Sequence, residues 1–297
     1  MQYLITGGTG FIGSNFINSL AEQDKVIILS RGKINQQKKN VRTINTLEEV
    51  NDNEKIDCII NLAGKSIDCL WTKTAKQELI NSRINTTKKL ITLIDRLKQK
   101  PEVMISASAI GFYGAYNNEV LDEYSIAKQS FTHKLCKEWE DTANLAIKHG
   151  VRVCLTRFAV VLGKNQGFIK KTYLPFKLGL GGKIGSGKQI FPWVHIEDVI
   201  KSIKYLINNK DSQGAYNIVA PQRTTNSELT KAIGKSLNRP TIFSIPEFFI
   251  KLAFQEMGIE LLLKGNEIVP KRILDSGYKF NYTKIDNVLK NIYMKDS

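Results

Sequence analysis

The chain has 297 residues, of which 42% are hydrophobic and 24% charged, an ordinary composition for a soluble globular protein with a large core. Its apolar runs are much shorter than the roughly 20 residues that a membrane span needs, so we expect no membrane span. The net charge of +15 makes nucleic acid a candidate partner. However, the excess of Lys and Arg is spread along the chain, without basic runs interleaved with aromatic residues. We therefore expect no nucleic-acid partner.

The start of the chain enters a predicted strand and a glycine-rich turn within seven residues, which leaves no room for a secretion signal. The four cysteines lack the paired spacing of a zinc site or a redox motif. They are Cys58, Cys69, Cys136 and Cys154. We expect reduced thiols, no metal site and a cytoplasmic protein.

Hydrophobic periodicity predicts alternating strands and helices in the first half of the chain. The predicted strands are 2–6, 25–29, 41–44, 57–62, 103–107 and 151–156. The predicted helices are 11–23, 74–99 and 128–149. This alternation is typical of an α/β fold with a doubly wound parallel sheet of the Rossmann type, covered by helices on both faces.

Beyond residue 162 the sequence becomes richer in glycine loops. We expect a helix at 196–208, a strand at 215–219 and then helices separated by prolines. The predicted organisation is a Rossmann domain at 1–220 and a smaller, mostly helical C-terminal lobe at 221–297 that contributes to the substrate site. Residues 165–193 are expected to leave the Rossmann domain as a loop excursion toward this lobe.

The stretch LITGGTGFIG, residues 4–13, joins the first predicted strand to the first predicted helix. Its glycines have the spacing of a turn that binds a dinucleotide. Glycine lets the chain turn sharply and brings backbone N–H groups close to a pyrophosphate at the positive end of the helix dipole. We expect the following residues to hold the cofactor: Gly7, Thr9, Gly10, Phe11, Ile12 and Gly13.

The end of the second predicted strand, in ILSRGK, indicates which dinucleotide binds. A preference for NAD needs an acidic residue about 20 positions after the turn. This chain has Ser30 and Arg31 there instead. A guanidinium can hold the 2′-phosphate of NADP(H) through two hydrogen bonds, whereas a carboxylate would repel it. We predict NADP(H) as the preferred cofactor and NAD(H) as the alternative.

A second glycine cluster, GGKIGSGKQ, places Gly182, Gly187 and Lys188 in the frame of a phosphate-binding loop of ATPases and GTPases. Gln189 follows, where such a loop needs a hydroxyl to bind magnesium. We therefore expect a flexible loop near the substrate cleft rather than a nucleotide triphosphate site.

Longer motifs accompany the glycine turn: NLAG at 61–64, SASAIGFYG at 106–114, RFAVVLG at 157–163 and PWVHIEDV at 192–199. With them, essentially the whole chain resembles the extended and atypical short-chain dehydrogenase/reductase (SDR) superfamily. Three further segments are typical of its branch of epimerase family proteins with a distinctive C-terminal domain. These are FTHKLCKEWE at 131–140, LGLGGKIGSGKQIFPWVHIEDV at 178–199 and VPKRILDSGYKF at 269–280.

The resemblance implies an NAD(P)-dependent oxidoreductase or an epimerase-like enzyme. It implies that four residues lie beside the cofactor: Leu62, Ala63, Gly64 and Asn85. Lys134 is also expected to contact the cofactor. It also implies that Ser108 and Tyr113, after the fifth strand, lie where the superfamily has its active-site hydroxyls.

The resemblance implies largely structural roles for His195 and Asp198. We expect a packed, hydrogen-bonded histidine and a carboxylate in the first turn of a helix, where its charge suits the dipole. The candidate substrate residues are Lys183, Trp193 and Arg272. Trp193 could stack on a base or a sugar ring, and the two basic residues could meet phosphates, although core packing and surface solvation account for them as well.

SDR chemistry uses a Tyr-x-x-x-Lys pair on one helical face, in which the lysine favours the phenolate that exchanges a proton with the substrate. The literal match here is Tyr124 and Lys128. Lys128 lies 29 residues before Arg157. Lys134 lies 23 before it, closer to the superfamily spacing, but four residues before Lys134 stands Ser130.

Two interpretations remain open. In the first, Tyr124 and Lys128 form a shifted pair in a working reductase or epimerase. In the second, which the spacing favours, the pair is absent, and Lys134, Ser108 or Tyr113 serves a weaker chemistry or none. The leading hypothesis is an NADP(H)-binding oxidoreductase or nucleotide-sugar epimerase-like enzyme with a small polar substrate. The alternative is a non-catalytic NADP(H)-binding scaffold or redox sensor. Helices on an exposed sheet face would permit a two-fold homodimer.

Overall fold

The computed structural model describes residues 1–30, 32, 40–114 and 119–294. Its centre is a seven-stranded parallel sheet in the order β11-β7-β5-β4-β1-β2-β3. The strands are β1 (Gln2–Thr6), β2 (Lys25–Leu29), β3 (Val41–Ile44), β4 (Cys58–Asn61), β5 (Val103–Ala109), β7 (Arg152–Phe158) and β11 (Gly214–Ile218). The predicted Rossmann-type fold is confirmed.

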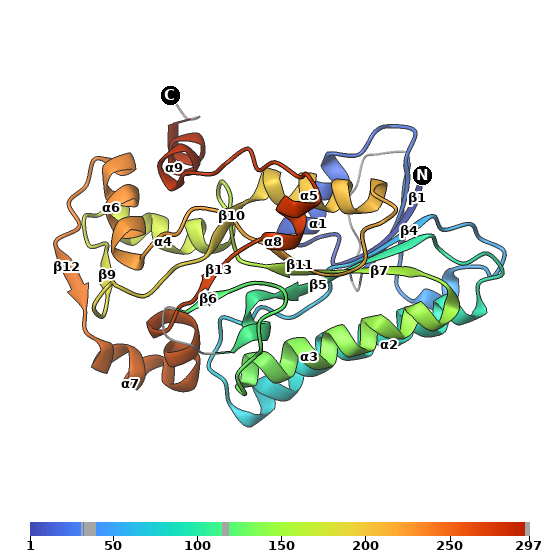
Figure 1. Cartoon of the computed structure of the whole chain (residues 1–297), viewed down its shortest axis with the longest axis horizontal. Helices are drawn as coiled ribbons and strands as arrows, with labels where there is room; N and C mark the ends of the chain where they lie inside the picture. The colour runs from blue at the N-terminus through green and yellow to red at the C-terminus, as the bar shows by residue number, and fades with distance from the viewer. Residues whose placement is uncertain (31, 33–39, 115–118, 295–297) are drawn as a thin grey trace.

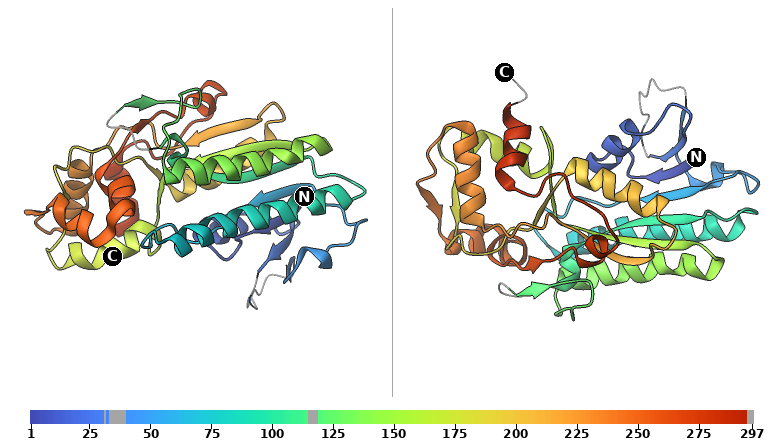
Figure 2. Two further views of the ribbon diagram at one scale, coloured as in Figure 1. Left: turned by 90° about the horizontal axis from the view of Figure 1, so that it is seen from below. Right: turned by 45° about the horizontal axis from the view of Figure 1, so that its top comes forward.

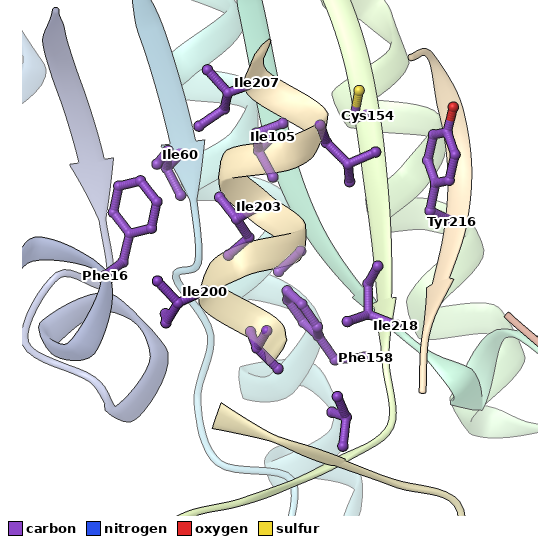
Figure 3. Close-up of a cluster of buried hydrophobic side chains, with 14 of the residues drawn as sticks. Phe16, Ile60, Ile105, Cys154, Phe158, Ile200, Ile203, Ile207, Tyr216 and Ile218 are labelled. Carbon is purple, nitrogen blue, oxygen red and sulfur yellow. The ribbon is translucent and has the colours of Figure 1, made fainter. Parts of the chain in front are cut away.

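Helices cover both faces of the sheet, as Figure 1 shows. One face carries α2 (Lys73–Arg96) and α3 (Phe131–Asn144), and the other carries α1 (Phe11–Asn18) and α5 (Ile196–Asn208). All four residues of β4 are buried, as expected for a central parallel strand that is covered on both sides. In Figure 3, α5 lies over the face of the sheet, and its Ile200 and Ile203 pack against buried side chains of the strands.

Side-chain caps decide where the two long helices begin. The Thr72 hydroxyl accepts from the N–H of Ala75 at the start of α2. The Ser130 hydroxyl accepts from the N–H of His133 at the start of α3. An N-cap of this kind contributes about 1 kcal/mol. The helix that we expected from residue 128 therefore begins three residues later.

The C-terminal lobe is built from α4 (Gly167–Lys177), β9 (Gly182–Ile184), α6 (Asn226–Leu237), β12 (Phe243–Ile245), α7 (Glu247–Gly258) and α9 (Ile285–Met294). Strands β9 and β12 pair in parallel, and a separate apolar cluster joins Phe176 of α4 to Ile233 of α6 and Val288 of α9. Figure 2 shows these elements together at one end of the molecule. Residues 165–193, predicted as a loop excursion, contain the helix α4 and the strand β9.

After α7 the chain returns to the edge of the main sheet. There, β13 (Glu267–Ile268) pairs with β6 (Val120–Leu121), and α8 (Lys271–Asp275) lies against β11. The amide of Asn217 in β11 donates to the carbonyl of Val269 at 3.0 Å. The C-terminal segment is therefore joined to the Rossmann domain at two places.

The remaining elements are short. They are β8 (Val160–Leu162), β10 (Trp193–His195), the 3-10 helices η1 (Leu47–Glu49), η2 (Ile110–Tyr113) and η3 (Leu145–His149), and the π-helix η4 (Ile259–Leu263). No helix in the described ranges is both long enough and apolar enough to cross a bilayer.

Candidate functional site

A cleft of about 970 Å³ opens at the carboxyl ends of β1, β2 and β4. The order of the sheet reverses between β1 and β4, and such a switch point is where doubly wound sheets bind ligands. The glycine turn, the end of β2, the loop after β4 and one side of α2 line the cleft. The lining residues are Thr6, Gly7, Thr9, Gly10, Leu29, Ser30, Gly32, Leu62, Ala63, Gly64, Lys65, Glu78, Asn81, Ser82 and Thr86.

Seven residues predicted for the cofactor are among them: Gly7, Thr9, Gly10, Ser30, Leu62, Ala63 and Gly64. The other predicted residues are placed differently. Phe11, Ile12 and Gly13 form the first turn of α1 without lining the cleft, and Asn85 of α2 is exposed outside it. Arg31 lies outside the described residues.

The glycine turn has a geometry that side chains would prevent. Gly7 has a φ of +70°, and a Cβ there would lie 2.6 Å from the carbonyl oxygen of Leu62. A Cβ at Gly13 would lie 2.3 Å from the carbonyl oxygen of Gly7. Gly10 is the N-cap of α1 and supplies no side-chain cap to the helix. The turn and the start of α1 therefore offer backbone donors and a positive dipole end to an anion, which fits the diphosphate of a dinucleotide.

A buried polar chain supports the floor of the cleft. The Thr6 hydroxyl donates to Asn61 Oδ1 at 2.7 Å and accepts from the N–H of Ala63 at 3.2 Å. The Asn61 amide donates to the hydroxyls of Thr87 at 2.8 Å and Ser106 at 3.2 Å. These bonds join β1, β4, β5 and α2 beneath the cleft. The sequence patterns did not predict this chain, although each of three neighbouring strands carries one of its polar residues: Thr6, Asn61 and Ser106.

The α2 side of the cleft carries a salt bridge between Lys65 and Glu78. This hydrogen bond raises the pKa of the Lys65 ammonium. The backbone of Lys65 is held as well, because its N–H donates to the Ser82 hydroxyl at 3.0 Å and its carbonyl accepts from Arg83 at 3.0 Å. The sequence motif ending at Gly64 did not point to these residues.

Tyr113 and Ser108 belong to a buried network outside the cleft. The Tyr113 hydroxyl donates to Asn217 Oδ1 at 2.7 Å and accepts from Arg157 at 3.1 Å. Burial raises the pKa of Tyr113 to about 12. The Ser108 hydroxyl donates to Glu140 at 2.6 Å, and Arg157 binds both oxygens of that carboxylate at 2.8 Å. Both hydroxyls thus form hydrogen bonds within the protein, and neither residue lines the cleft.

The other three catalytic candidates are not brought together either. Tyr124 is 71% exposed in the loop before α3. Lys128 forms a salt bridge with Glu119 at 3.4 Å in the same region. Because α3 begins after Ser130, the four-residue spacing of Tyr124 and Lys128 does not place them on one helical face. Lys134 lies on the exposed side of α3, 4.0 Å from a carboxylate oxygen of Glu138.

The inward face of α3 begins instead with Phe131 and Leu135. Leu135 is in a buried cluster with Trp71, Leu79 and Met257, and Phe131 packs against that cluster. The C-terminal lobe thus supplies Met257 to the start of α3.

The lobe also supplies a carboxylate there. Glu260 of η4 accepts from the Thr132 hydroxyl at 2.9 Å and from the N–H groups of Phe131 and Thr132 at 3.4 Å. A negative charge in this position suits the positive end of the α3 dipole. Nearby, Glu256 pairs with Lys76 of α2 at 2.5 Å.

Two of the three substrate candidates have structural roles. Trp193 is fully buried in the lobe core, and its indole N–H donates to the Thr224 hydroxyl at 2.9 Å. Arg272 donates to the carbonyls of Ala215 at 2.6 Å and Gln213 at 2.8 Å at the edge of the sheet. Trp193 therefore does not stack on a ligand, and the Arg272 guanidinium already has acceptors. Lys183 lies half-buried in β9.

His195 and Asp198 are structural, as expected. His195 caps α5 by accepting from the N–H of Glu197 at 3.3 Å, and its ring centroid lies 3.8 Å from that of Tyr282. Asp198 is buried and accepts from the N–H groups of Asn281 and Tyr282 at 2.8 Å each. In the part of the chain that the structure describes, no group of three His, Cys, Asp or Glu residues is arranged to hold a metal ion.

Known proteins match this chain along its length. Residues 3–219 match the NAD-dependent epimerase/dehydratase family, and residues 245–292 match a domain of unknown function, DUF1731. The epimerase family protein YfhF of Bacillus subtilis is 35% identical over 98% of both chains. The chloroplastic epimerase family protein SDR39U1 homolog of Arabidopsis thaliana is 33% identical over 98% of this chain and 86% of its own.

Solved structures show the same likeness. The crystal structure of human epimerase family protein SDR39U1 with NADPH has a TM-score of 0.89 and is 31% identical, over 99% of both chains. A nucleoside-diphosphate sugar epimerase of Corynebacterium glutamicum has a TM-score of 0.79 and is 26% identical, over 99% of this chain and 58% of its own. The chain therefore belongs to the NAD-dependent epimerase/dehydratase family of extended SDR proteins and carries the DUF1731 domain at its C-terminal end.

Proposed function

We propose that the protein binds NADP(H) in the cleft at the glycine turn and acts as an oxidoreductase or a nucleotide-sugar epimerase-like enzyme on a small polar substrate. The observation that carries this proposal is the cleft itself, whose lining contains seven of the residues predicted for the cofactor. The bound NADPH of the human SDR39U1 structure supports the choice of cofactor. NAD(H) remains the second choice, because a structural neighbour of the same fold binds NAD.

Each part of the cleft has a role in this proposal. The turn from Gly7 to Gly10 and the first turn of α1 hold the diphosphate through backbone N–H groups. Ser30 and Arg31 receive the 2′-phosphate at the end of β2. The nicotinamide, when bound, supplies a hydride donor or acceptor. We expect a cytoplasmic location for this activity.

The proposal includes a degenerate catalytic pair. Proton transfer at neutral pH needs a group whose pKa lies near the working pH. Tyr113 does not meet this condition, because burial raises its pKa to about 12 and its hydroxyl is already hydrogen-bonded. At the start of α3, Phe131 and Leu135 pack into an apolar cluster and carry no titratable group. The buried His133 and Glu140 of the same helix are titratable, but His133 is hydrogen-bonded to the Phe112 carbonyl and Glu140 to Arg157. This helix favours the second candidate function, a non-catalytic NADP(H)-binding scaffold or redox sensor.

Cofactor binding is tested by titrating the wild type and Arg31→Ala with NADPH and NADH, followed by fluorescence. We expect Arg31→Ala to weaken NADPH binding about ten- to a hundredfold and to leave NADH binding unchanged, because only NADPH has the 2′-phosphate. Equal losses for both cofactors would reject the role of Arg31. Wild-type protein that binds neither cofactor would reject the proposed function.

Catalysis is tested by a screen of nucleotide sugars and carbonyl compounds for cofactor oxidation or epimer formation. Turnover supports the enzyme, and NADPH binding without turnover across the screen supports the sensor. If turnover is found, Tyr124→Phe should leave it unchanged. Loss of turnover in this variant would instead support the interpretation in which Tyr124 and Lys128 form a shifted catalytic pair.

A further inference from the structure

The salt bridge between Lys65 and Glu78 lies in the wall of the cleft at the glycine turn. Among the described residues that line this cleft, these two carry the charges. Their side chains are 45% and 53% exposed. A pair this exposed adds little to stability, so either partner can leave the other for a ligand at a small cost in free energy.

The backbone of Lys65 is fixed, although its side chain is half-exposed. Its N–H donates to the Ser82 hydroxyl at 3.0 Å, and its carbonyl accepts from Arg83 at 3.0 Å. Arg83 also lies directly behind Gly64, because a Cβ on Gly64 would be 3.0 Å from the guanidinium carbon. Lys65 therefore enters the cleft from a backbone that is held against α2.

This position is next to the glycine turn. A Cβ on Gly7 would lie 2.6 Å from the carbonyl oxygen of Leu62 and 3.0 Å from the backbone nitrogen of Ala63, so the turn touches the loop after β4. Lys65 follows Ala63 by two residues and has a flexible four-carbon stem. Its ammonium can therefore turn from Glu78 toward an anion that is bound on the glycine turn.

The order of the sheet separates Lys65 from the end of β2. Strand β1, which carries the glycine turn, lies between β4 and β2. Lys65 follows β4, whereas Ser30 follows β2 on the other side of the turn. An anion near Lys65 is therefore the diphosphate on the turn rather than the 2′-phosphate at the end of β2.

The diphosphate benefits from a full positive charge at this place. Backbone N–H groups and the α1 dipole offer it partial charges. The Glu78 carboxylate in the same cleft repels it and also holds the Lys65 ammonium. An ammonium that leaves Glu78 for the diphosphate forms a charge-assisted hydrogen bond with a phosphate oxygen.

We propose that Lys65 is a second anchor for the cofactor diphosphate, and that it exchanges its salt bridge with Glu78 for a phosphate oxygen when the cofactor binds. This inference rests on the proposed function of the cleft. Glu78 competes with the cofactor for the ammonium. The pair thus sets the affinity for NADPH and NADH alike, whereas Arg31 is expected to distinguish them.

Lys65→Met tests the anchor in the titration that is followed by fluorescence. It should weaken NADPH and NADH binding about tenfold each, because both cofactors carry the diphosphate. Lys65→Arg keeps the charge and should stay within about threefold of the wild type. The control is Lys137→Met, which removes the ammonium of an exposed ion pair with Asp141 on α3 and should change neither affinity.

Two smaller probes, measured by calorimetry, separate the phosphates. ADP-ribose carries the diphosphate without the 2′-phosphate, and adenosine 2′-monophosphate carries the 2′-phosphate without the diphosphate. Lys65→Met should weaken the binding of ADP-ribose about tenfold and change that of adenosine 2′-monophosphate less than about twofold.

Glu78→Gln tests the exchange of partners. It should tighten the binding of both cofactors about threefold when Lys65 is present and leave it unchanged in the Lys65→Met background, because Glu78 then has no ammonium to hold. Direct repulsion of the cofactor by Glu78 would give the opposite order, with the larger gain in the Lys65→Met background.

Three results would overturn the inference, provided that circular dichroism shows folded variants. They are unchanged binding of NADH and ADP-ribose in Lys65→Met, a loss confined to ligands with a 2′-phosphate, and a gain from Glu78→Gln that is as large without Lys65 as with it. Each of these leaves the proposed function in place. Wild-type protein that binds neither NADPH nor NADH would reject both.

Discussion

At the scale of single residues, the glycine turn depends on the absence of side chains. A Cβ at Gly13 would lie 2.3 Å from the carbonyl oxygen of Gly7 and 2.7 Å from the Cα of Gly8. Both are backbone atoms, so the turn itself must move. We predict that Gly13→Ala lowers NADPH affinity by about tenfold or more in a fluorescence titration.

Gly32 provides a matched control in the same cleft, because a Cβ there meets nothing within 4 Å. Gly32→Ala should leave the affinity within about threefold of the wild type. If both alanine variants lost the same affinity, the close approach of Gly13 and Gly7 would not be the reason.

The buried ion pair of Arg157 and Glu140 is a second feature at this scale. Both side chains are about 5% exposed, and the guanidinium binds the carboxylate in a bidentate manner. Glu140→Leu leaves the guanidinium charge unpaired and should lower the free energy of unfolding by about 3–5 kcal/mol in urea denaturation. Asp141→Asn, which breaks an exposed pair with Lys137 on the same helix, should cost less than about 1 kcal/mol. Similar losses in the two variants would contradict the role of burial.

At the scale of elements, the start of α3 depends on the lobe as well as on its own cap. The Glu260 carboxylate accepts from the Thr132 hydroxyl and lies near two N–H groups of the first turn. Glu260→Gln keeps the shape but removes the charge, and should lower the free energy of unfolding by about 1–2 kcal/mol. In this variant, amide exchange in residues 256–263 should be faster than in the wild type, whereas exchange in the central strands should change less.

Glu138→Gln is the control for this element, since it removes an exposed charge from α3 near Lys134. Its effect should stay within about 0.5 kcal/mol. Unchanged exchange in residues 256–263 of the Glu260→Gln variant would mean that apolar contacts alone dock the lobe.

At the scale of the whole molecule, the C-terminal segment completes the Rossmann domain rather than forming a separate unit. Strand β13 pairs with β6, Arg272 binds carbonyls beside β11, and Asp198 binds the backbone of Asn281 and Tyr282. Removing residues 265–297 strips the buried Asp198 carboxylate of both donors and exposes the core beneath α9. We predict that the truncated chain does not fold stably and that the full chain unfolds in one calorimetric transition. A stable proteolytic fragment that ends near residue 220 would contradict this.

Much of the fold could be predicted from the sequence, because strands, helices and turns follow from local patterns. The alternation of elements predicted the doubly wound sheet, and helix 196–208 was predicted with the bounds that α5 has. Helix boundaries were less certain. The expected start of α3 was three residues early because apolar periodicity does not register the Ser130 cap, and this shift decides whether Tyr124 and Lys128 share a helix.

The sequence by itself determined the glycine turn and the family, and with them seven residues that line the cleft, because these depend on spacing along a short piece of chain. Only the tertiary structure decided which hydrogen bonds Tyr113, Trp193 and Arg272 form. From the sequence alone, each of these residues is a candidate for catalysis or binding. Each is committed in the folded protein to acceptors far away in the chain: Asn217, Thr224 and Ala215. Burial and hydrogen-bond satisfaction are properties of contacts between distant segments, so no local pattern of residue types can report them.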